Sequence, residues 1–516
     1  MRVAPKNRTA ALLVVCAAAL TAPGRADIGA SPQPSLTDAQ IAAVDAIGQR
    51  SVAGKAAPGV TIAIQRNGAT VYARGFGYRN VENAIAPDGQ TRYPIGSNTK
   101  QFTAAAILLL QDEGKLDVDA PLATYLPEIP HAREVRLRNL LTHSGGYAEY
   151  TEIGSFDEIG NRPVTAEQIV AAVDRRPLAF VPGTKRQYSN TGYALLTMVI
   201  ERVSKMRYAD FLQAKIFGPL GMTATYVRGS DDTQPNVATE YQSYARGPWE
   251  HALHIDYTWF SGAGWIVSNA ADLAKWNAAL DGGTLLSKRS LGEMMTPVKL
   301  GTLFPGYGFG IIVSKLANGH RMISHGGNTT GSATQDARFP DDHLAIEVLA
   351  NSGAFGYNSA VAAVYGALVP ASATPAPGPS AMPSRPQASK SIPGADPRTI
   401  AAARSWLDRA VAGHVVLADL RPDVRARMSP AHLAALRALV ALGPRTYKLL
   451  QVDRRPPATT YAFSVSTPAK SLLYVYGRDD DGTISGAEVV ETINYASPAT
   501  ASPTPIASPQ SAPLKP

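Results

Sequence analysis

The stretch PIGSNTK, Pro94–Lys100, places a serine three residues before a lysine. It opens the run SNTKQFTAAAILLLQDEGKL (Ser97–Leu116), whose pattern predicts a helix with a glycine-containing end. Residues three apart share a helix face, so Ser97 and Lys100 can touch. The free N–H groups and positive dipole end of such a helix would stabilise an oxyanion formed near Ser97. The simpler interpretation is that Ser97 only caps the helix.

Two later stretches carry residues that would complete a site around this pair. The first is KRQYSNTGY, in which Tyr188-Ser189-Asn190 begins 91 residues after Ser97. A tyrosine oxygen near an ammonium group can be partly ionised, so it can take a proton from a serine. The second is ISHGGNTTG, in which two glycines follow His325 and let a strand lie close beside a substrate. Taken singly, the tyrosine is typical of a core and the glycine pair of a turn.

The chain around these stretches alternates helix and strand patterns from about Leu36 to Val369. The expected elements are two strands around an Asn-Gly turn in Gly59–Val81, helices over Thr191–Lys205 and Ser268–Gly283, and an apolar strand over His343–Ser352. The second of these helices carries an apolar stripe at Leu273, Trp276 and Leu280. Mixed helix and strand patterns of this kind indicate an α/β or α+β class.

The N-terminus, MRVAPKNRTAALLVVCAAALTAPGRAD, has the layout of a secretory signal peptide. A basic stretch precedes an apolar run too short to span a bilayer, and small residues follow, which predicts cleavage after Ala26. The alternative is an N-terminal anchor, and a lipoprotein anchor at Cys16 is disfavoured by the bulky Val15 before it. Cys16 is the only cysteine, so the mature chain would have no disulfide, thiolate zinc site or cysteine nucleophile.

The overall composition argues against a nucleic-acid partner. The chain has 516 residues, 45% of them hydrophobic and 17% charged, which is enough for two or three globular domains. The formal charge of +8 includes four basic residues and no acid in 1–26, so the remainder carries only about +4. No run of lysine or arginine and no basic-aromatic interleaving is present.

The region after residue 370 has a different composition. Residues 371–396 form a predicted Pro/Ala/Ser linker without a packing pattern. Residues 397–494 read as a small α+β module, with two helical patterns (TIAAARSWLDRAVAGH and SPAHLAALRALVALG) followed by four strand-like runs. Residues 495–516 are rich in Pro, Ser and Ala and are predicted to be a disordered tail.

In chain order, Ser-x-x-Lys, Tyr-Ser-Asn and His-Gly-Gly resemble the serine β-lactamase and penicillin-binding-protein superfamily. The resemblance is greatest to the class C β-lactamase branch, which includes D-Ala-D-Ala carboxypeptidases, D-aminopeptidases of the S12 peptidase type and class VIII-type esterases. Further stretches typical of this branch are LLTHSGG (140–146), FVPGTKRQYSN (180–190), SGAGWIVSNAADLAKW (261–276) and YGFG (307–310). The resemblance covers about residues 36–370. It implies an antiparallel sheet flanked by helices beside an all-helical subdomain, with the site in the cleft between them.

The resemblance also implies roles for individual residues. Ser97 would be the nucleophile, and Lys100 would deprotonate it or hold its base. Tyr188 would be the general base for acylation and the acid for the leaving group, and Asn190 would contact substrate amide or carbonyl groups. His325, Gly326 and Gly327 stand where Lys-Thr-Gly often stands. The oxyanion hole would consist of the backbone N–H groups of Ser97 and Asn328.

One departure from the family pattern affects the expected substrate. His325 is only partly charged near neutral pH and Gly326 has no hydroxyl, so a substrate carboxylate would be held less firmly than by Lys-Thr-Gly. We therefore expect an exported serine hydrolase of residues 27–370, periplasmic or secreted, that acts through an acyl-enzyme on small esters or on D-amino-acid or peptide-like amides. The alternatives are a β-lactamase or D-Ala-D-Ala carboxypeptidase, and a sensor that binds penicillin or peptidoglycan without turnover. We expect no cofactor, no metal, and no membrane span after signal cleavage.

One missing motif and two weak signals also bear on the function. There is no Gly-x-Ser-x-Gly elbow, which disfavours an ordinary α/β-hydrolase. His251 and His254 in EHALHID can share a helix face as metal ligands, but no third ligand is evident. GRDDDGTISGAE (Gly477–Glu488) has the spacing of a calcium loop, yet Gly477 stands at the first ligand position and strand patterns flank it. A tight turn between two strands is the preferred interpretation.

Overall fold

The computed structural model describes residues 35–491 with internal gaps. The gaps are residues 55, 153–159, 174, 230–231, 244–247, 299, 301–305, 370–395, 416, 428–433, 435–442, 456–457 and 469–470. The predicted signal peptide, all but the last residue of the predicted linker, and the predicted tail lie outside the described residues. Most of the predicted helix in SPAHLAALRALVALG lies outside them as well.

A seven-stranded antiparallel sheet organises residues 36–369, with the strand order β2-β1-β12-β11-β10-β9-β8. The strands are β1 Gly59–Arg66, β2 Ala69–Gly77, β8 Gly306–Tyr307, β9 Ile312–Lys315, β10 Arg321–Asn328, β11 Ala333–Phe339 and β12 Leu344–Ala350. The predicted hairpin is present, and Asn67 and Gly68 both take positive φ in its turn. The predicted apolar strand is β12, which is buried along its whole length because helices cover both faces of the sheet.

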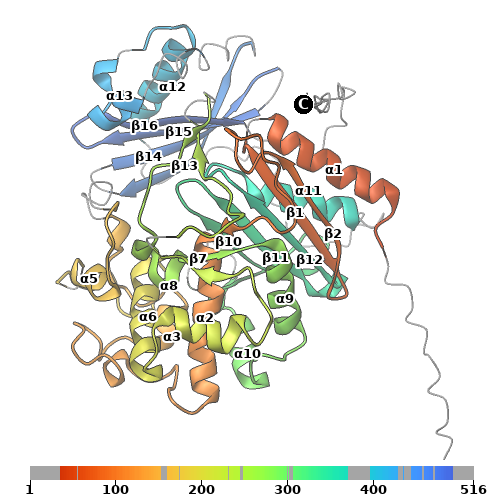
Figure 1. Ribbon diagram of the computed structural model, residues 1–516. Helices are drawn as coiled ribbons and strands as arrows, with labels where there is room; N and C mark the ends of the chain where they lie inside the picture. Colours follow the sequence, from red (N-terminus) through yellow and green to blue (C-terminus); the bar gives the residue numbers. More distant parts are fainter. Residues whose placement is uncertain are drawn as a thin grey trace, which may run out of the picture. The chain divides into compact units, whose positions relative to one another are not determined.

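One face of the sheet is covered by α1 (Asp38–Ala53) and α11 (Tyr357–Leu368), from opposite ends of this region. A capping box of Thr37 and Gln40 starts α1, since each residue satisfies the other's backbone N–H. The two helices pack on each other and on β1, β2, β11 and β12, where they bury a core of aliphatic and aromatic side chains. Figure 1 shows α1 and α11 side by side behind this part of the sheet.

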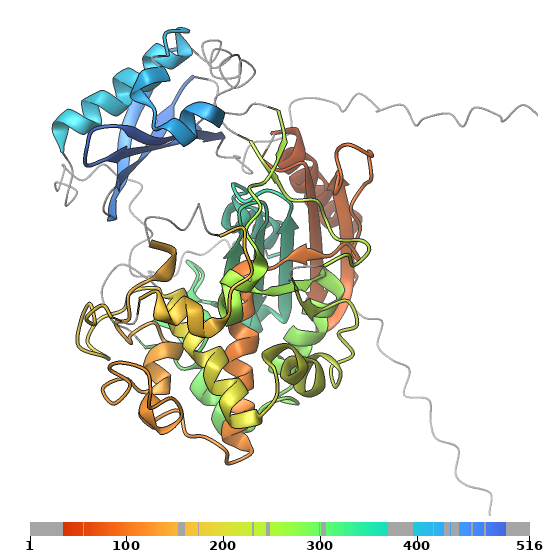
Figure 2. The same ribbon diagram turned by 60° about the vertical axis from the view of Figure 1, so that its left-hand side comes forward.

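The other face carries a larger helical region. Its helices are α2 Thr99–Asp112, α3 Leu137–Leu141, α5 Ala166–Ala171, α6 Asn190–Ser204, α7 Tyr208–Leu212, α8 Ser261–Gly264, α9 Ala270–Asp281 and α10 Lys288–Met295. The core of this region surrounds α2 and α6, which are buried along most of their length. The predicted stripe of α9 belongs to this core. Figures 1 and 2 show α2 and α6 side by side in this region. The expected antiparallel sheet flanked by helices, with a helical subdomain beside it, is therefore confirmed.

The edge of β10 changes character along the strand. Its first half, Arg321 to Ser324, pairs with β9, and the pairing with β11 begins at Ile323 on the other side. From His325 to Asn328 only the β11 side is paired among the described strands. These four residues contain the motif His-Gly-Gly. On the side opposite β11, their backbone has no neighbouring described strand.

The described residues after 395 have a hydrophobic core of their own. This part of the chain contains α12 Pro397–Val411, α13 Pro422–Arg427 and the antiparallel sheet β13-β14-β15-β16. The strands are β13 Thr446–Arg455, β14 Ala458–Ser466, β15 Ser471–Asp479 and β16 Ile484–Glu491, at the four predicted runs. Side chains of α12 pack against β14 and β15. The calcium-like stretch is the β15–β16 turn, in which Gly482 has a φ of 94° and Asp481 accepts hydrogen bonds from Thr483.

Two carboxyl groups lie opposite each other in the centre of the main sheet. Asp336 on β11 faces Glu347 on β12, and both side chains are buried. Asn277 of α9 donates to both, and Gln65 and Gln101 each donate to one of them. Loss of water raises the pKa of both carboxyl groups, and the Asp336 charge raises the pKa of Glu347 further.

This pair gives a first prediction, on stability. The folded Glu347 keeps its proton above the ordinary glutamate value of 4.5, whereas the unfolded chain releases it. The free energy of unfolding therefore falls as the pH rises above about 4.5, because the unfolded state then binds fewer protons. Glu347→Gln removes this titration, so its stability relative to wild type should improve by about 1 kcal/mol or more between pH 5 and 8. Urea unfolding at several pH values measures this difference, and a gap that stays constant with pH would contradict it.

Candidate active site

Ser97 does not cap a helix. It lies in a 3-10 turn, Gly96–Asn98, that leads into α2, and the α2 cap residue Asn98 makes no side-chain capping bond. The Ser97 Oγ instead lies 3.1 Å from the Lys100 Nζ and 2.7 Å from the Tyr188 hydroxyl. The Ser-x-x-Lys pair of the sequence is therefore in contact, and Tyr188 meets it from the start of α6, 91 residues along the chain.

The hydrogen bonds of Lys100 leave one direction open toward Ser97. Its Nζ lies 2.8 Å from the Asn190 Oδ1 and 2.8 Å from the carbonyl oxygen of Ala263, and both of these atoms can only accept. An ammonium group then directs its third hydrogen at the Ser97 Oγ. A neutral amine directs its lone pair there, so a deprotonated Lys100 is oriented to receive the Ser97 proton.

The protonated and the neutral form of Lys100 are both well populated at neutral pH. The side chain is fully buried, and this loss of water lowers its pKa from 10.5 to about 7, although the carboxylate of Glu149 opposes the shift. Lysines with such values can act as bases near pH 7.

Glu149 orients the neighbour of Lys100. Its carboxylate accepts hydrogen bonds from the Asn190 backbone N–H at 2.5 Å and from the Asn190 Nδ2 at 3.0 Å. A carboxylate can only accept here, so the amide of Asn190 must turn its oxygen toward Lys100. Glu149 also lies at the N-terminus of α6, where the helix dipole favours a negative charge. Sequence reasoning missed Glu149, because a single acid in SGGYAEY carries no spacing signal.

We predict that Glu149→Gln shifts the pH profile of the first reaction step. Removing the negative charge removes the effect that raises the Lys100 pKa, so the apparent pKa of acylation should fall by about one unit. Loss of the Asn190 anchor should also lower kcat/KM by about 10-fold. Stopped-flow acylation rates between pH 5 and 9 test this. An apparent pKa that stays in place or rises would contradict the electrostatic role.

Tyr188 turns its hydroxyl inward while its ring borders the cleft. The side chain is 44% exposed, and one ring face packs on His143 with a centroid distance of 4.3 Å. Its hydroxyl is held at Ser97, where loss of water raises the tyrosine pKa and the hydrogen bond to Ser97 partly offsets this. The direction of this shift favours a neutral phenol in the resting protein. The Lys100 Nζ lies 4.7 Å from the centre of the ring.

His325 is neutral. Burial and the nearby Lys100 lower its pKa to about 3. Its Nδ1 lies 2.6 Å from the carbonyl oxygen of Gly326, which only accepts, so Nδ1 carries the proton and Nε2 accepts from the Tyr307 hydroxyl at 2.9 Å. His325 therefore brings no positive charge to the cavity, which strengthens the departure from Lys-Thr-Gly expected from the sequence.

The glycines of the motif let β10 approach Ser97. A Cβ on Gly327 would lie 1.9 Å from the carbonyl oxygen of Ile95 and 2.9 Å from the backbone nitrogen of Ser97. On the Ser97 side, Gly96 has a φ of 48° and lies against the backbone of Asn328. The backbone N–H groups expected to form the oxyanion hole thus come from two segments in direct contact.

These residues share one cavity of about 410 Å³. Its lining residues are Ser97, His143, Arg186, Tyr188, Tyr307, Ile312, His325, Gly326, Asn328 and Tyr357. Asn190 and Gly327 lie behind this surface, where Asn190 contacts Lys100 and Gly327 contacts the turn of Ser97. No acidic residue lines the cavity within the part of the chain that the structure describes.

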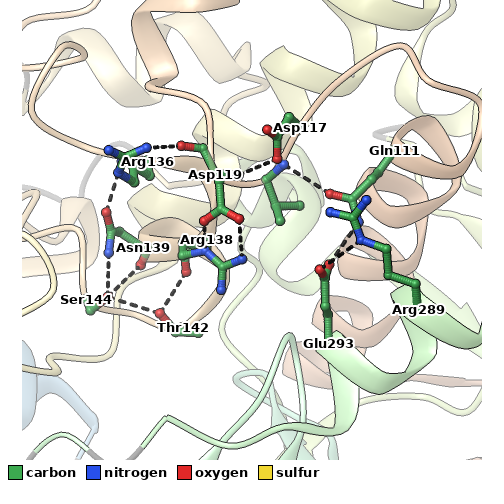
Figure 3. A network of polar contacts seen from close by, with 11 residues as sticks. Gln111, Asp117, Asp119, Arg136, Arg138, Asn139, Thr142, Ser144, Arg289 and Glu293 are labelled. Atoms are coloured by element: carbon green, nitrogen blue, oxygen red, sulfur yellow. Dashed lines mark hydrogen bonds and ion pairs between the residues drawn. The ribbon is translucent and has the colours of Figure 1, made fainter.

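The loop LLTHSGG places His143 behind Tyr188. His143 is buried, and its Nδ1 accepts from the Ser189 backbone N–H. Figure 3 shows how the flanking chain is held, with Asn139 and Thr142 both bonded to Ser144, and the Arg138 guanidinium paired with Asp119. Each neighbour of His143 in this loop is thus anchored to the helical region.

The two histidines of EHALHID lie elsewhere. His251 belongs to the short strand β6 (Glu250–His251), which pairs with β5 (Tyr241–Gln242), and its ring lies 5.4 Å from that of Tyr241. His254 follows in a loop, so the shared helix face considered for them is wrong. No group of three or more His, Cys, Asp or Glu side chains able to hold a metal occurs within the described ranges.

Comparison with known proteins decides the family. Residues 44–369 match the model of the beta-lactamase family, which is more than half of the chain. The chain belongs to the beta-lactamase family. This beta-lactamase-family protein is 30% identical over 279 residues to the putative penicillin-binding protein PbpX of Bacillus subtilis, covering 54% of this chain and 68% of that protein.

Three solved structures share the fold of this chain. The D-stereospecific amidohydrolase from Streptomyces sp. is 29% identical, with a TM-score of 0.56 and 63% of this chain and 97% of that chain covered. The D-amino acid amidase from Ochrobactrum anthropi SV3 is 28% identical in its complex with L-phenylalanine amide, with a TM-score of 0.58 and 64% and 98% covered. The octameric penicillin-binding protein homologue from Pyrococcus abyssi, at 22% identity and a TM-score of 0.58, shares the fold over 88% of this beta-lactamase-family chain.

Every helix in the described ranges is too short or too polar to cross a bilayer. The cavity lining also includes five residues that were not expected from the sequence, namely His143, Arg186, Tyr307, Ile312 and Tyr357. His143, Arg186 and Tyr307 belong to stretches that carry the family resemblance. Ile312 and Tyr357 have no sequence signal beyond their residue type.

Proposed function

We propose that the protein is an exported serine hydrolase that forms an acyl-enzyme on Ser97. The observation that carries the proposal is the double contact of the Ser97 Oγ, with the Lys100 amine on one side and the Tyr188 phenol on the other. A serine between a base and an acid of this kind is the arrangement required for acyl transfer. The export is proposed from the signal peptide pattern, and the catalytic unit is residues 27–370.

In the first step, neutral Lys100 takes the Ser97 proton while the Oγ forms a bond to the substrate carbonyl carbon. The carbonyl electrons move to the oxygen, which the backbone N–H groups of Ser97 and Asn328 stabilise. The tetrahedral intermediate then expels the leaving group, and the Tyr188 hydroxyl gives that group its proton. The resulting phenolate lies beside the Lys100 ammonium, which offsets its negative charge.

The second step releases the acyl group to water. The Tyr188 phenolate takes a proton from a water molecule, and the oxygen of that water bonds to the acyl carbon. The second tetrahedral intermediate breaks the bond to the Ser97 Oγ, which regains its proton from the Lys100 ammonium. Both side chains then return to their starting protonation states.

For the substrate we propose small esters or D-amino-acid and peptide-like amides. The neutral His325 supports this choice over penicillins, because it offers no charge to a carboxylate. A relative of known structure is described as a D-amino acid amidase, which supports the amide part of the proposal. The open backbone edge of β10 from His325 to Asn328 suits a substrate with an extended amide.

The test is mass spectrometry of the mature protein after brief mixing with a p-nitrophenyl ester, a D-alanyl amide and a cephalosporin. We expect an acyl adduct on the peptide that contains Ser97, with released product from the ester or the amide. An adduct on another residue, or turnover without any adduct on that peptide under rapid quench, would overturn the proposal. A stable Ser97 adduct without product would support a sensor, and preferred turnover of the cephalosporin would support a β-lactamase.

A further inference from the structure

Tyr357 occupies the space that a side chain at position 326 would take. It is the first residue of α11, and its ring approaches β10 at the motif His-Gly-Gly. A Cβ built on Gly326 would lie 2.5 Å from the Tyr357 hydroxyl oxygen and 2.6 Å from a ring carbon. A real Cβ is essentially never this close to another side chain, so Tyr357 can adopt this position because residue 326 is glycine.

The hydroxyl of Tyr357 is available to a molecule in the cavity. Tyr357 is partly exposed and lines the same cavity as Ser97, together with its neighbours Gly326 and Asn328. Its hydroxyl makes no hydrogen bond to any residue that the structure describes. Burial raises the pKa of this phenol, so at neutral pH it keeps the proton that it can donate.

We propose that Tyr357 is a substrate-binding residue whose hydroxyl serves in place of the one that Gly326 cannot provide. The inference rests on the proposed function, because it needs a scissile carbonyl at Ser97. The hydrogen-bond donor at this point of the site is then a side chain of α11, Tyr357, and not a side chain of β10.

The position of Tyr357 along β10 defines the group that it binds. Asn328, whose N–H would hold the scissile carbonyl oxygen, lies two residues beyond Gly326, or about 7 Å along the strand. The phenol therefore donates to an oxygen about one residue away from the scissile carbonyl. Two parts of a substrate reach that distance, namely the carbonyl of an acylamino group on the acyl side and a carboxylate on the leaving-group side.

Three substrates show which of these two groups Tyr357 binds. p-Nitrophenyl butyrate has no carbonyl or carboxylate oxygen beyond the reacting ester. The p-nitrophenyl ester of N-acetyl-D-alanine has the same leaving group and adds a carbonyl on the acyl side, and m-carboxyphenyl butyrate has a carboxylate on the leaving group. Each is hydrolysed by wild type, Tyr357→Phe and Tyr365→Phe, and the ratio of kcat/KM between variant and wild type is compared across substrates. Tyr365 is a matched control on the same helix, because its hydroxyl bonds Asp342 and Asn318 outside the cavity.

We expect Tyr357→Phe to lower kcat/KM about 10-fold for at least one accepting substrate and less than about 2-fold for p-nitrophenyl butyrate. The affected substrate identifies the group that Tyr357 binds, either the acyl-side carbonyl or the leaving-group carboxylate. Tyr365→Phe should give the same ratio for all three. An equal effect of Tyr357→Phe on all three substrates would overturn the inference while leaving the proposed function intact. Absence of turnover and of a Ser97 adduct with every substrate would contradict the proposed function, and the inference with it.

A reciprocal variant tests the same assignment from the other side. Tyr357→Ala removes the ring that a side chain at 326 would meet, so Gly326→Ser becomes compatible with the fold in that background. The double variant should recover at least part of the lost discrimination between accepting and non-accepting substrates. Gly326→Ser alone should lower activity on all three, since its Cβ would displace Tyr357. A double variant no better than Tyr357→Ala would count against the exchange of hydroxyls.

Discussion

Ser97→Ala is expected to remove the acyl adduct and to lower kcat/KM for the best substrate by about 10³-fold or more. The reason is geometric, because Ser97 places its Oγ within 3.1 Å of both Lys100 and Tyr188. No covalent intermediate can form without that oxygen. Residual catalysis should come from the backbone N–H groups and substrate binding alone.

The measurement is rapid-quench mass spectrometry beside steady-state kinetics, with the melting temperature as a check of folding. Ser97 makes no capping bond, so the variant should melt within about 2 °C of wild type. Ser359→Ala, at an exposed position of α11, is the matched control and should react as wild type does. Adduct formation in Ser97→Ala at the wild-type rate would show that another group is the nucleophile.

Lys100→Met is expected to be nearly as severe, with a loss of about 10³-fold in the acylation rate. The wild-type rate should increase as the pH rises through about 7, because only the deprotonated amine can take the Ser97 proton. Methionine fills a similar volume without a base, so this titration should disappear. The double variant with Ser97→Ala should be no slower than Ser97→Ala alone, since the two groups act as a unit.

Acylation rates measured by stopped flow between pH 5 and 9 provide the check. The profile of the Met variant should be flat through pH 7. Lys275→Met is a suitable control, because Lys275 is an exposed lysine on α9 that pairs with Asp272, and it should keep the wild-type profile. A Met variant that retained the rise near pH 7 would assign the base to a different group.

The sequence predicted those parts of the site that depend on local spacing. Ser97 and Lys100 are one helical turn apart, so their contact follows from the helix itself. The hairpin at Asn67-Gly68 likewise follows from turn chemistry. Tyr188 and the glycines of β10 are distant in sequence, and only the family resemblance connected them with Ser97.

Residues that act through tertiary packing carried no signal. Glu149 reaches Asn190 because the loop after α3 folds across the start of α6, and no motif marks that approach. Tyr357 lies far from Ser97 in the sequence, at the start of α11, and only the fold brings it to the cavity. The helix face considered for the histidines of EHALHID does not form for a related reason, since pairing of β6 with β5 overrides the helical spacing of the segment.

The open half of β10 also limits the length of extended chain that can pair beside Ser97. Four residues, His325 to Asn328, have no described strand beside them on the Ser97 side, which is a length of about 13 Å. An extended backbone can therefore pair there over only a few atoms on either side of the cleaved bond. The chain of a folded protein does not fit into a cavity of about 410 Å³. A hydrolase acting at this edge would thus spare the intact polypeptides around it while it processes short molecules, which is a built-in safeguard for neighbouring proteins.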